Sequence, residues 1–129
     1  MTSNKFYYQP IGIKQYPLIP VTLHHLSNAI SISALIDSGA DFGCFKAELA
    51  DELGIPLERG EKREITTVGG KITAYMHNIE VQLFDKKIKC QVAFSREFRF
   101  HLNILGRQDF FNAHQILFKE KEKIVEITE

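Results

Sequence analysis

The stretch Ala34-Leu35-Ile36-Asp37-Ser38-Gly39-Ala40-Asp41 runs from three apolar residues directly into Asp-Ser-Gly. An apolar run in front of a carboxylate predicts a buried strand that delivers an acid to a loop. The glycine permits a tight turn and the close approach of another backbone, and the serine adds a short hydroxyl beside the acid. A carboxylate held in a dry place among hydrogen-bond donors is a candidate general acid or base. Asp37 is therefore the candidate catalytic residue, in a loop with Ser38, Gly39 and Ala40.

Asp-Ser-Gly is also ordinary turn chemistry, because Asp and Ser side chains bond to nearby backbone groups and Gly accepts a positive φ. Turn residues usually lie between polar flanks, whereas Ile32 and the apolar residues of the quoted stretch precede this triplet. The flanks favour a functional loop, and they leave a plain turn as the alternative.

A second stretch, Asn103-Ile104-Leu105-Gly106-Arg107, repeats the pattern of a short apolar run followed by glycine, about seventy residues further on. It predicts another buried strand. After it, residues 107–113 are expected to form a short helix with Phe110 and Phe111 facing inward. The preceding segment, 95–101, is rich in Arg and Phe, and we expect it near a substrate groove or at an interface.

Length and composition indicate one soluble globular domain. The chain has 129 residues, of which 44% are hydrophobic and 25% charged, enough for a single core. Sixteen basic residues balance sixteen acidic ones, which argues against a nucleic-acid or anionic-membrane partner. No apolar run approaches the ~20 residues that span a bilayer, and the N-terminus lacks the apolar core of a signal peptide.

The two cysteines, Cys44 and Cys90, lie far apart and outside any metal-binding spacing. We therefore expect no metal and no other cofactor. The spacing does not decide between two free thiols and one disulfide. We expect free thiols and a cytoplasmic location.

Alternating apolar and polar residues between turn signals predict a mainly β fold. The expected hairpins join residues 16–26 to 29–36, 65–68 to 71–76, 79–84 to 88–94, and 115–119 to 123–128. Apolar residues at four-residue spacing predict a helix over Phe45–Leu53. Such short strands with one or two short helices favour a small closed or partly open β-barrel. Residues 1–15 are expected to form a loosely ordered arm before a single domain at 16–129.

Together, the two stretches resemble the two signatures of aspartic proteases. The first matches that family's loop, in which two apolar residues precede Asp-Thr/Ser-Gly-Ala/Ser, and Ile104-Leu105-Gly106 matches its second signature. In the retroviral, retropepsin-like branch an Asp follows the loop and an Arg follows the second glycine, as Asp41 and Arg107 do here. The resemblance covers roughly residues 16–127 and implies a barrel of the acid-protease type. Ser38 stands where retroviral members of the family more usually have threonine, which is a mild departure from the family pattern.

The resemblance implies two further site elements. One is a flap, the hairpin that closes over bound peptide, whose residues would be Thr66, Thr67, Val68, Gly69, Gly70 and Lys71. A plain surface hairpin would have the same pattern. The other is a buried, bidentate ion pair between Asp41 and Arg107 that fixes the active-site loop; its alternative is a surface pair of little energetic value.

An aspartic protease needs two carboxylates on one water, and this chain carries a single Asp-Ser/Thr-Gly. The resemblance therefore implies a homodimer in which a two-fold axis brings Asp37 against Asp37 of the partner subunit. The expected activity is endopeptidase hydrolysis of a peptide or protein substrate. The terminal strand, residues 123–128, is expected where the family commonly builds its dimer sheet.

Two other functions fit the same pattern. A non-catalytic dimeric barrel could bind peptides by strand pairing, and a structural domain could use Asp37 only as a turn residue. The intact loop from Asp37 to Ala40 favours the protease, because a binding module does not need the acid.

Overall fold

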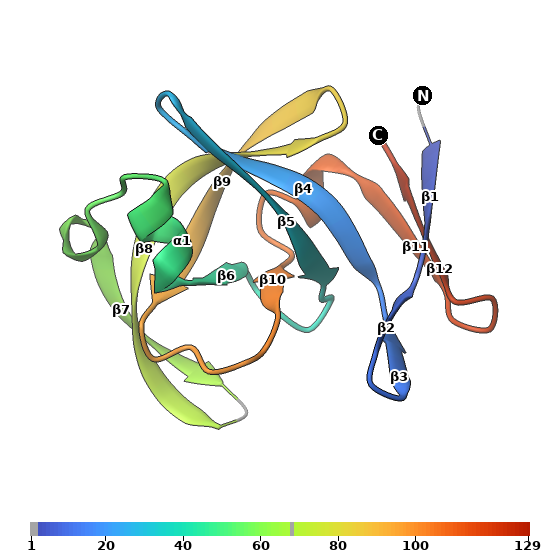
Figure 1. The fold of residues 1–129 in the computed structure, drawn as a ribbon, viewed down its shortest axis with the longest axis horizontal. Helices are drawn as coiled ribbons and strands as arrows, with labels where there is room; N and C mark the ends of the chain where they lie inside the picture. The colour runs from blue at the N-terminus through green and yellow to red at the C-terminus, as the bar shows by residue number, and fades with distance from the viewer. Residues whose placement is uncertain (1–2, 68) are drawn as a thin grey trace.

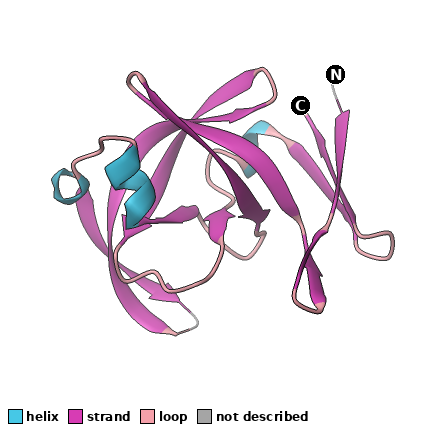
Figure 2. Cartoon of the chain, viewed as in Figure 1, coloured by secondary structure: helices cyan, strands magenta, loops and turns pink. Residues whose placement is uncertain are grey.

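The computed structural model describes residues 3–67 and 69–129 of a mainly β chain (Figures 1 and 2). Its strands are β1 (Ser3–Tyr7), β2 (Gln9–Ile11), β3 (Lys14–Tyr16), β4 (Leu18–His25), β5 (Asn28–Ile36), β6 (Gly43–Lys46), β7 (Glu61–Thr67), β8 (Gly70–Leu83), β9 (Lys86–Ser95), β10 (Asn103–Leu105), β11 (Gln115–Lys119) and β12 (Ile124–Thr128). The helical segments are α1 (Ala47–Glu52) and the 3₁₀ turns η1 (Leu57–Arg59) and η2 (Phe111–Ala113).

The main sheet closes into a barrel, as the sequence predicted. Its strand order is β4-β5-β10-β6-β9-β8-β7, and β4 also pairs with β8. The closed ring therefore consists of β4, β5, β10, β6, β9 and β8, and β7 lies outside it. The predicted hairpins β4–β5, β7–β8 and β8–β9 are all present, with β8 shared by two of them. Along β4, Val21 and Leu23 point into the barrel and are buried, whereas Thr22 between them is not, the alternation that a one-sided sheet requires.

One crossing of the chain places the two signature stretches side by side. β10 lies between β5 and β6, parallel to β5 and antiparallel to β6. In this arrangement Ile104 is paired with Leu35 on one side and with Cys44 on the other. The loop that follows β5 therefore spans the end of β10, where the second glycine stands.

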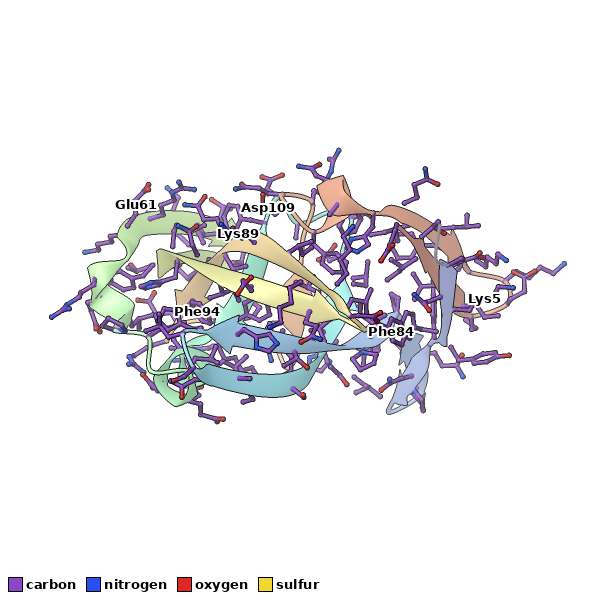
Figure 3. All side chains as sticks on the ribbon, turned by 90° about the horizontal axis from the view of Figure 1, so that it is seen from above. Lys5, Glu61, Phe84, Lys89, Phe94 and Asp109 are labelled. Carbon is purple, nitrogen blue, oxygen red and sulfur yellow. The ribbon has the colours of Figure 1, made fainter. Side chains whose placement is uncertain are left out.

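The interior is apolar and its largest fully buried side chains are Phe45, Phe94 and Phe110. Figure 3 shows Phe94 within the body, whereas Glu61 and Lys89 extend to the outside. In the described part of the chain, no helix has the length and apolar character that crossing a membrane requires.

Both predicted helices are shorter in the structure. α1 begins at Ala47 rather than at Phe45, because Gly43–Lys46 pairs with β9 and β10 as a strand. Phe45 is buried, as the helical pattern required, but it enters the core from β6. The helix expected over residues 107–113 is reduced to the 3₁₀ turn η2, preceded by Asp109 at a φ of +66°. A non-glycine residue in this left-handed region interrupts a right-handed helix.

The two chain ends form a second, three-stranded sheet in the order β1-β12-β11 (Figure 1). The predicted terminal hairpin β11–β12 is present, and β12 is the central strand, with Val125 and Ile127 buried. The loosely ordered arm expected over residues 1–15 is wrong: β1 pairs with β12 along its whole length. Tyr8 is buried after it, and its hydroxyl donates to Glu120 Oε1 at 2.9 Å.

Candidate active site

The loop after β5 holds Asp37 in a defined position. The Asp37 N–H donates to the carbonyl oxygen of Leu105 at 3.1 Å, which continues the pairing between β5 and β10 by one residue. The Ala40 N–H donates to the Asp37 carbonyl at 3.2 Å and closes a turn, while the Gly39 N–H donates to Asp37 Oδ1 at 2.9 Å. The Asp37 side chain is half-buried. One carboxylate oxygen is thus fixed by the backbone of its own loop.

The second signature stretch holds the far side of this loop. The Arg107 N–H donates to the Ala40 carbonyl at 2.9 Å, and the Gln108 N–H donates to the Asp41 carbonyl at 2.7 Å. Together with the bond from Asp37 to Leu105, these bonds extend the contact between the two segments beyond the paired residues of β5 and β10. The Asp37 loop and the end of β10 are therefore joined through main-chain groups.

Gly106 allows the two stretches to come this close. A Cβ at this position would lie 2.5 Å from the Phe42 carbonyl oxygen, 2.6 Å from its carbon and 2.8 Å from the Ala40 carbonyl oxygen. A real Cβ essentially never approaches another atom so closely, so only glycine fits here. At Gly39 the constraint is weaker, because a Cβ would lie 3.3 Å from Asp37 Oδ1.

The predicted ion pair between Asp41 and Arg107 is not formed. Both side chains are exposed, and the ion pairs of the described residues do not include this one. The expectation of a buried pair is therefore wrong for this chain. Sequence places the two residues near each other, but it does not fix the direction in which long side chains point.

A groove of about 760 Å³ opens beside the Asp37 loop. Its lining comes from three segments of the chain. The loop contributes Asp37, Gly39, Ala40 and Asp41; the β7–β8 hairpin contributes Ile65, Thr66, Thr67, Gly69, Lys71 and Ile72; and the segment after β9 contributes Glu97, Phe98, Arg99 and Phe100. Phe42, Cys44 and Ile104 complete the lining. The apolar side chains can accept apolar groups of a ligand, and the open strand edges offer backbone partners.

Of the predicted flap residues, Thr66, Thr67, Gly69 and Lys71 line one wall of this groove. At the hairpin tip the Thr67 hydroxyl donates to the Gly70 carbonyl at 2.7 Å, and Gly70 has a φ of +119°, which favours glycine. A Cβ at Gly69 or Gly70 would meet nothing within 4 Å, so neither glycine is required there by close packing. Val68, which was also predicted for the flap, lies outside the described residues.

Sequence reasoning missed how this hairpin is anchored. Ser95 is buried, and its hydroxyl donates to the Thr73 carbonyl at 2.5 Å while accepting the Glu97 N–H at 3.0 Å. The Glu97 carboxylate in turn accepts the Thr73 N–H at 3.2 Å. The segment 95–101, expected near a groove or an interface, does line the groove. In the sequence, a serine at the end of an alternating strand pattern is ordinary, and its burial appears only in the structure.

Neither cysteine is suited to be a nucleophile. Cys44 lines the groove and Cys90 lines a separate cavity, and both are free and buried. Burial raises the pKa of each thiol to about 12. A reactive cysteine needs the opposite shift, toward a thiolate at neutral pH. The chemistry of the groove therefore rests on its carboxylates.

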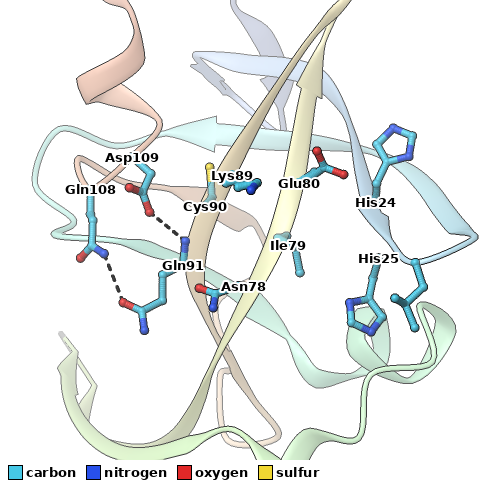
Figure 4. Close-up of a pocket in the computed structure, with 11 residues that line it drawn as sticks. His24, His25, Asn78, Ile79, Glu80, Lys89, Cys90, Gln91, Gln108 and Asp109 are labelled. Carbon is cyan, nitrogen blue, oxygen red and sulfur yellow. Dashed lines mark hydrogen bonds between the residues drawn. The ribbon is translucent and has the colours of Figure 1, made fainter.

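A second cavity, of about 740 Å³, is lined by residues of β4, β8 and β9 and by Gln108 and Asp109 (Figure 4). The Oδ2 of Asp109 accepts the Gln91 N–H at 2.8 Å. His24 lies across the sheet from Asp109 in Figure 4 and is bonded to Gln82 at 2.6 Å. These groups do not converge on one point, and we assign no chemistry to this cavity.

Comparisons with known proteins indicate the same family that the two signature stretches resemble. A family model described as aspartyl protease matches residues 19–106, a range that contains the Asp37 loop and Ile104-Leu105-Gly106 and ends before Arg107. Among solved structures, the chain is similar to a retropepsin-like aspartic protease from Rickettsia conorii, with a TM-score of 0.72, 15% identity and 98% of each chain covered. It is also similar to the EIAV protease in complex with the inhibitor HBY-793, with a TM-score of 0.57, 21% identity, and 76% of this chain and 88% of that one covered. Curated protein sequences give no match.

Proposed function

We propose, on the premise that the chain belongs to the aspartyl protease family and has a retropepsin-like fold, that it is an endopeptidase that cleaves peptide bonds as a homodimer. The observation that carries this proposal is Asp37, held in a backbone-bonded loop at the edge of a peptide-sized groove. The site residues are Asp37 as the catalytic acid and Ser38, Gly39 and Ala40 as its loop.

A single groove of this chain offers one acid of the required kind. The other carboxylates lining it are Asp41, which is exposed, and Glu97, which accepts the Thr73 N–H. Two-fold pairing would supply the second acid as Asp37 of the partner subunit. The exposed Ser38 hydroxyl is then placed to bond across the axis and hold the two loops together.

The pair of acids would work by sharing one proton. Two full charges about 3 Å apart repel by roughly 5 kcal/mol at an effective dielectric of 20, so one carboxyl group stays protonated while the other is ionised. The ionised group takes a proton from a water, whose oxygen attacks the scissile carbonyl carbon, while the protonated group donates to the carbonyl oxygen. Collapse of the tetrahedral intermediate breaks the C–N bond and passes a proton to the leaving amine.

The loop geometry suits this role. The Gly39 N–H on Oδ1 fixes the orientation of the Asp37 carboxylate, and the half-buried position leaves the other oxygen accessible from the groove. Such preorganised groups need no reorganisation when charge moves during the reaction. The hairpin formed by β7 and β8 serves as the flap in this proposal, since its tip lines the same groove and is anchored at its base through Ser95. Two free, buried cysteines fit a reducing, cytoplasmic setting.

The test compares wild type with Asp37→Asn and with Asp41→Asn, which makes the same change at an exposed neighbour. Asp37→Asn is expected to abolish cleavage of a peptide library without lowering the melting temperature, because Asn keeps the shape but cannot exchange the proton. Asp41→Asn is expected to retain cleavage. Adding excess Asp37→Asn chains to wild type should also suppress its activity, because mixed dimers carry one competent acid.

Two results would contradict the proposal. Cleavage by Asp37→Asn at the wild-type rate would remove Asp37 from the mechanism. Peptide binding without cleavage by wild type, unchanged in both variants, would instead support the non-catalytic peptide-binding barrel.

A further inference from the structure

The hairpin formed by β2 and β3 is separate from both larger sheets. Within the described chain it forms a two-stranded sheet of its own, and it extends from the body beyond the ends of β4 and β5 (Figure 1). Its turn carries Gly12, at a φ of +63°, followed by Ile13, whose side chain is 100% exposed. An isolated two-stranded hairpin is marginally stable in water, and a fully exposed isoleucine at its tip adds no stability to this chain alone.

The base of this hairpin lies beside the catalytic loop. The Pro17 carbonyl, directly after β3, accepts the N–H of Ile36, which immediately precedes Asp37, at 3.0 Å. Tyr16, the last residue of β3, makes an edge contact with the ring of His101 at 6.2 Å between centroids. His101 contacts Phe100 at 4.7 Å, and Phe100 lines the groove. Tyr16, Phe100 and His101 thus form an aromatic edge from the hairpin base to the groove wall.

The terminal strand that the family resemblance assigned to the dimer sheet is already occupied. β12 pairs with β1 on one side and β11 on the other, so it offers no free edge to a second chain. The hairpin and the terminal sheet both lie outside the residues 19–106 that the family model matches. β12 itself therefore cannot join a dimer sheet, and the free edges of the terminal sheet are those of β1 and β11.

We propose that the β2–β3 hairpin is the dimerisation arm, which reaches past the two-fold axis and packs Ile13 against the aromatic edge of a second copy of this chain. The inference rests on the proposed two-fold pairing at Asp37. A second copy is the occupant that completes the site, because only it brings another Asp37 to the base of the arm. A two-fold axis makes the contact reciprocal, with each arm on the other subunit.

The arm is long enough for this contact. Ile13 precedes Pro17 by four residues, which an extended chain spans in about 13 Å at roughly 3.3 Å per residue. Pro17 is one hydrogen bond from the strand that ends at Asp37, and the two catalytic carboxylates would meet at about 3 Å. The arm is therefore longer than the step from Pro17 to Asp37, which is one hydrogen bond of 3.0 Å and one residue along the chain.

The test is sedimentation velocity over a range of concentrations for wild type, Ile13→Asp and Leu26→Asp. Leu26 is a matched control: it is 89% exposed in the turn between β4 and β5, at the end of that hairpin opposite Asp37. Its φ of +53° is tolerated by Asp. Ile13→Asp should raise the dimer dissociation constant at least tenfold, Leu26→Asp should leave it unchanged, and both should keep the wild-type circular dichroism spectrum.

Each other outcome overturns the arm. Equal dissociation constants for all three proteins would show that Ile13 makes no contact, and equal weakening by both variants would show a general effect of charge. A wild type that stays monomeric at all concentrations would remove the dimer. Peptide cleavage by the same samples separates the two proposals. An Ile13-dependent dimer that cleaves nothing would support the arm and reject the protease, whereas a monomer that cleaves would reject the pairing at Asp37.

Discussion

Gly106→Ala should damage both stability and activity, although it adds one methyl group. The new Cβ would lie 2.5 Å from the Phe42 carbonyl oxygen and 2.8 Å from that of Ala40. Ordinary contact begins at 3.4 Å, so the Phe42 carbonyl would have to move by about 0.9 Å. The contacting atoms belong to the backbone and cannot rotate away. The Ala40 carbonyl also accepts the Arg107 N–H, so the shift is transmitted to the loop that carries Asp37.

The size of both effects follows from this displacement. Overpacking typically costs 1–3 kcal/mol, and we expect about 3 kcal/mol here because the neighbours are rigid. For a domain of this size that lowers the melting temperature by roughly 10 °C. A misplacement of about 1 Å can cost roughly 100-fold in rate, so peptide cleavage should fall by about that factor even at temperatures where the variant is folded.

Thermal unfolding followed by circular dichroism measures the first effect, and peptide cleavage at 20 °C or so, well below the transition, measures the second. Gly69→Ala is the matched control for stability, because a Cβ there meets nothing within 4 Å. It should leave the melting temperature nearly unchanged. A melting temperature of Gly106→Ala equal to that of wild type would refute the reasoning, since it would mean that the two signature stretches are not packed as closely as the structure shows.

Three further predictions concern the surroundings of the site. Arg107→Ala should change the free energy of unfolding, measured by urea titration, by no more than about 0.5 kcal/mol. The reason is that the side chain is exposed and forms none of the ion pairs of the described residues. A loss of several kcal/mol would instead support a buried ion pair with Asp41. Cys44 and Cys90 should resist iodoacetamide at pH 8 in the folded protein and react after denaturation. Burial raises the pKa of each thiol to about 12, so both thiols stay protonated at pH 8. Rapid labelling of the native protein, detected by mass spectrometry, would contradict this prediction. Hydrogen exchange at Thr66, Thr67 and Gly70 should slow when a pepstatin-type inhibitor binds, since the flap must close over the ligand; exchange that is indifferent to the inhibitor would count against the flap.

Local patterns predicted most of the strands, because a hairpin is defined by residues close in sequence. The pairs β4–β5, β8–β9 and β11–β12 all follow from alternation and turn residues. The pairing of β1 with β12 could not be predicted in this way, because Ser3 and Thr128 are partners from opposite ends of the chain. A five-residue strand near one end of the chain gives no local sign of its partner near the other end.

The candidate site shows the same division between local and distant information. The position of Asp37 at the end of a buried strand followed from the apolar run before it, and the place of Gly106 after a second buried strand from the apolar run at Ile104-Leu105, whereas the close contact at Gly106 appears only in the structure. Helical spacing at Phe45 was misleading, because a residue that must be buried satisfies a helical and a strand pattern alike. The predicted ion pair between Asp41 and Arg107 is absent because neighbouring backbone positions do not fix the directions of two long side chains. Here both side chains are exposed to solvent.

The loop around Asp37 is built from main-chain hydrogen bonds and one close glycine contact, so its shape depends little on the surrounding side chains. The consequence is that a folded chain already holds its acid in place before any partner arrives. Under the proposed mechanism the chain lacks the second acid, which a partner subunit would supply at the end of the barrel where the loop, the groove and the proposed β2–β3 arm lie together. If the pairing is correct, the strength of the subunit interface, rather than any rearrangement within the subunit, sets the protein concentration at which cleavage begins.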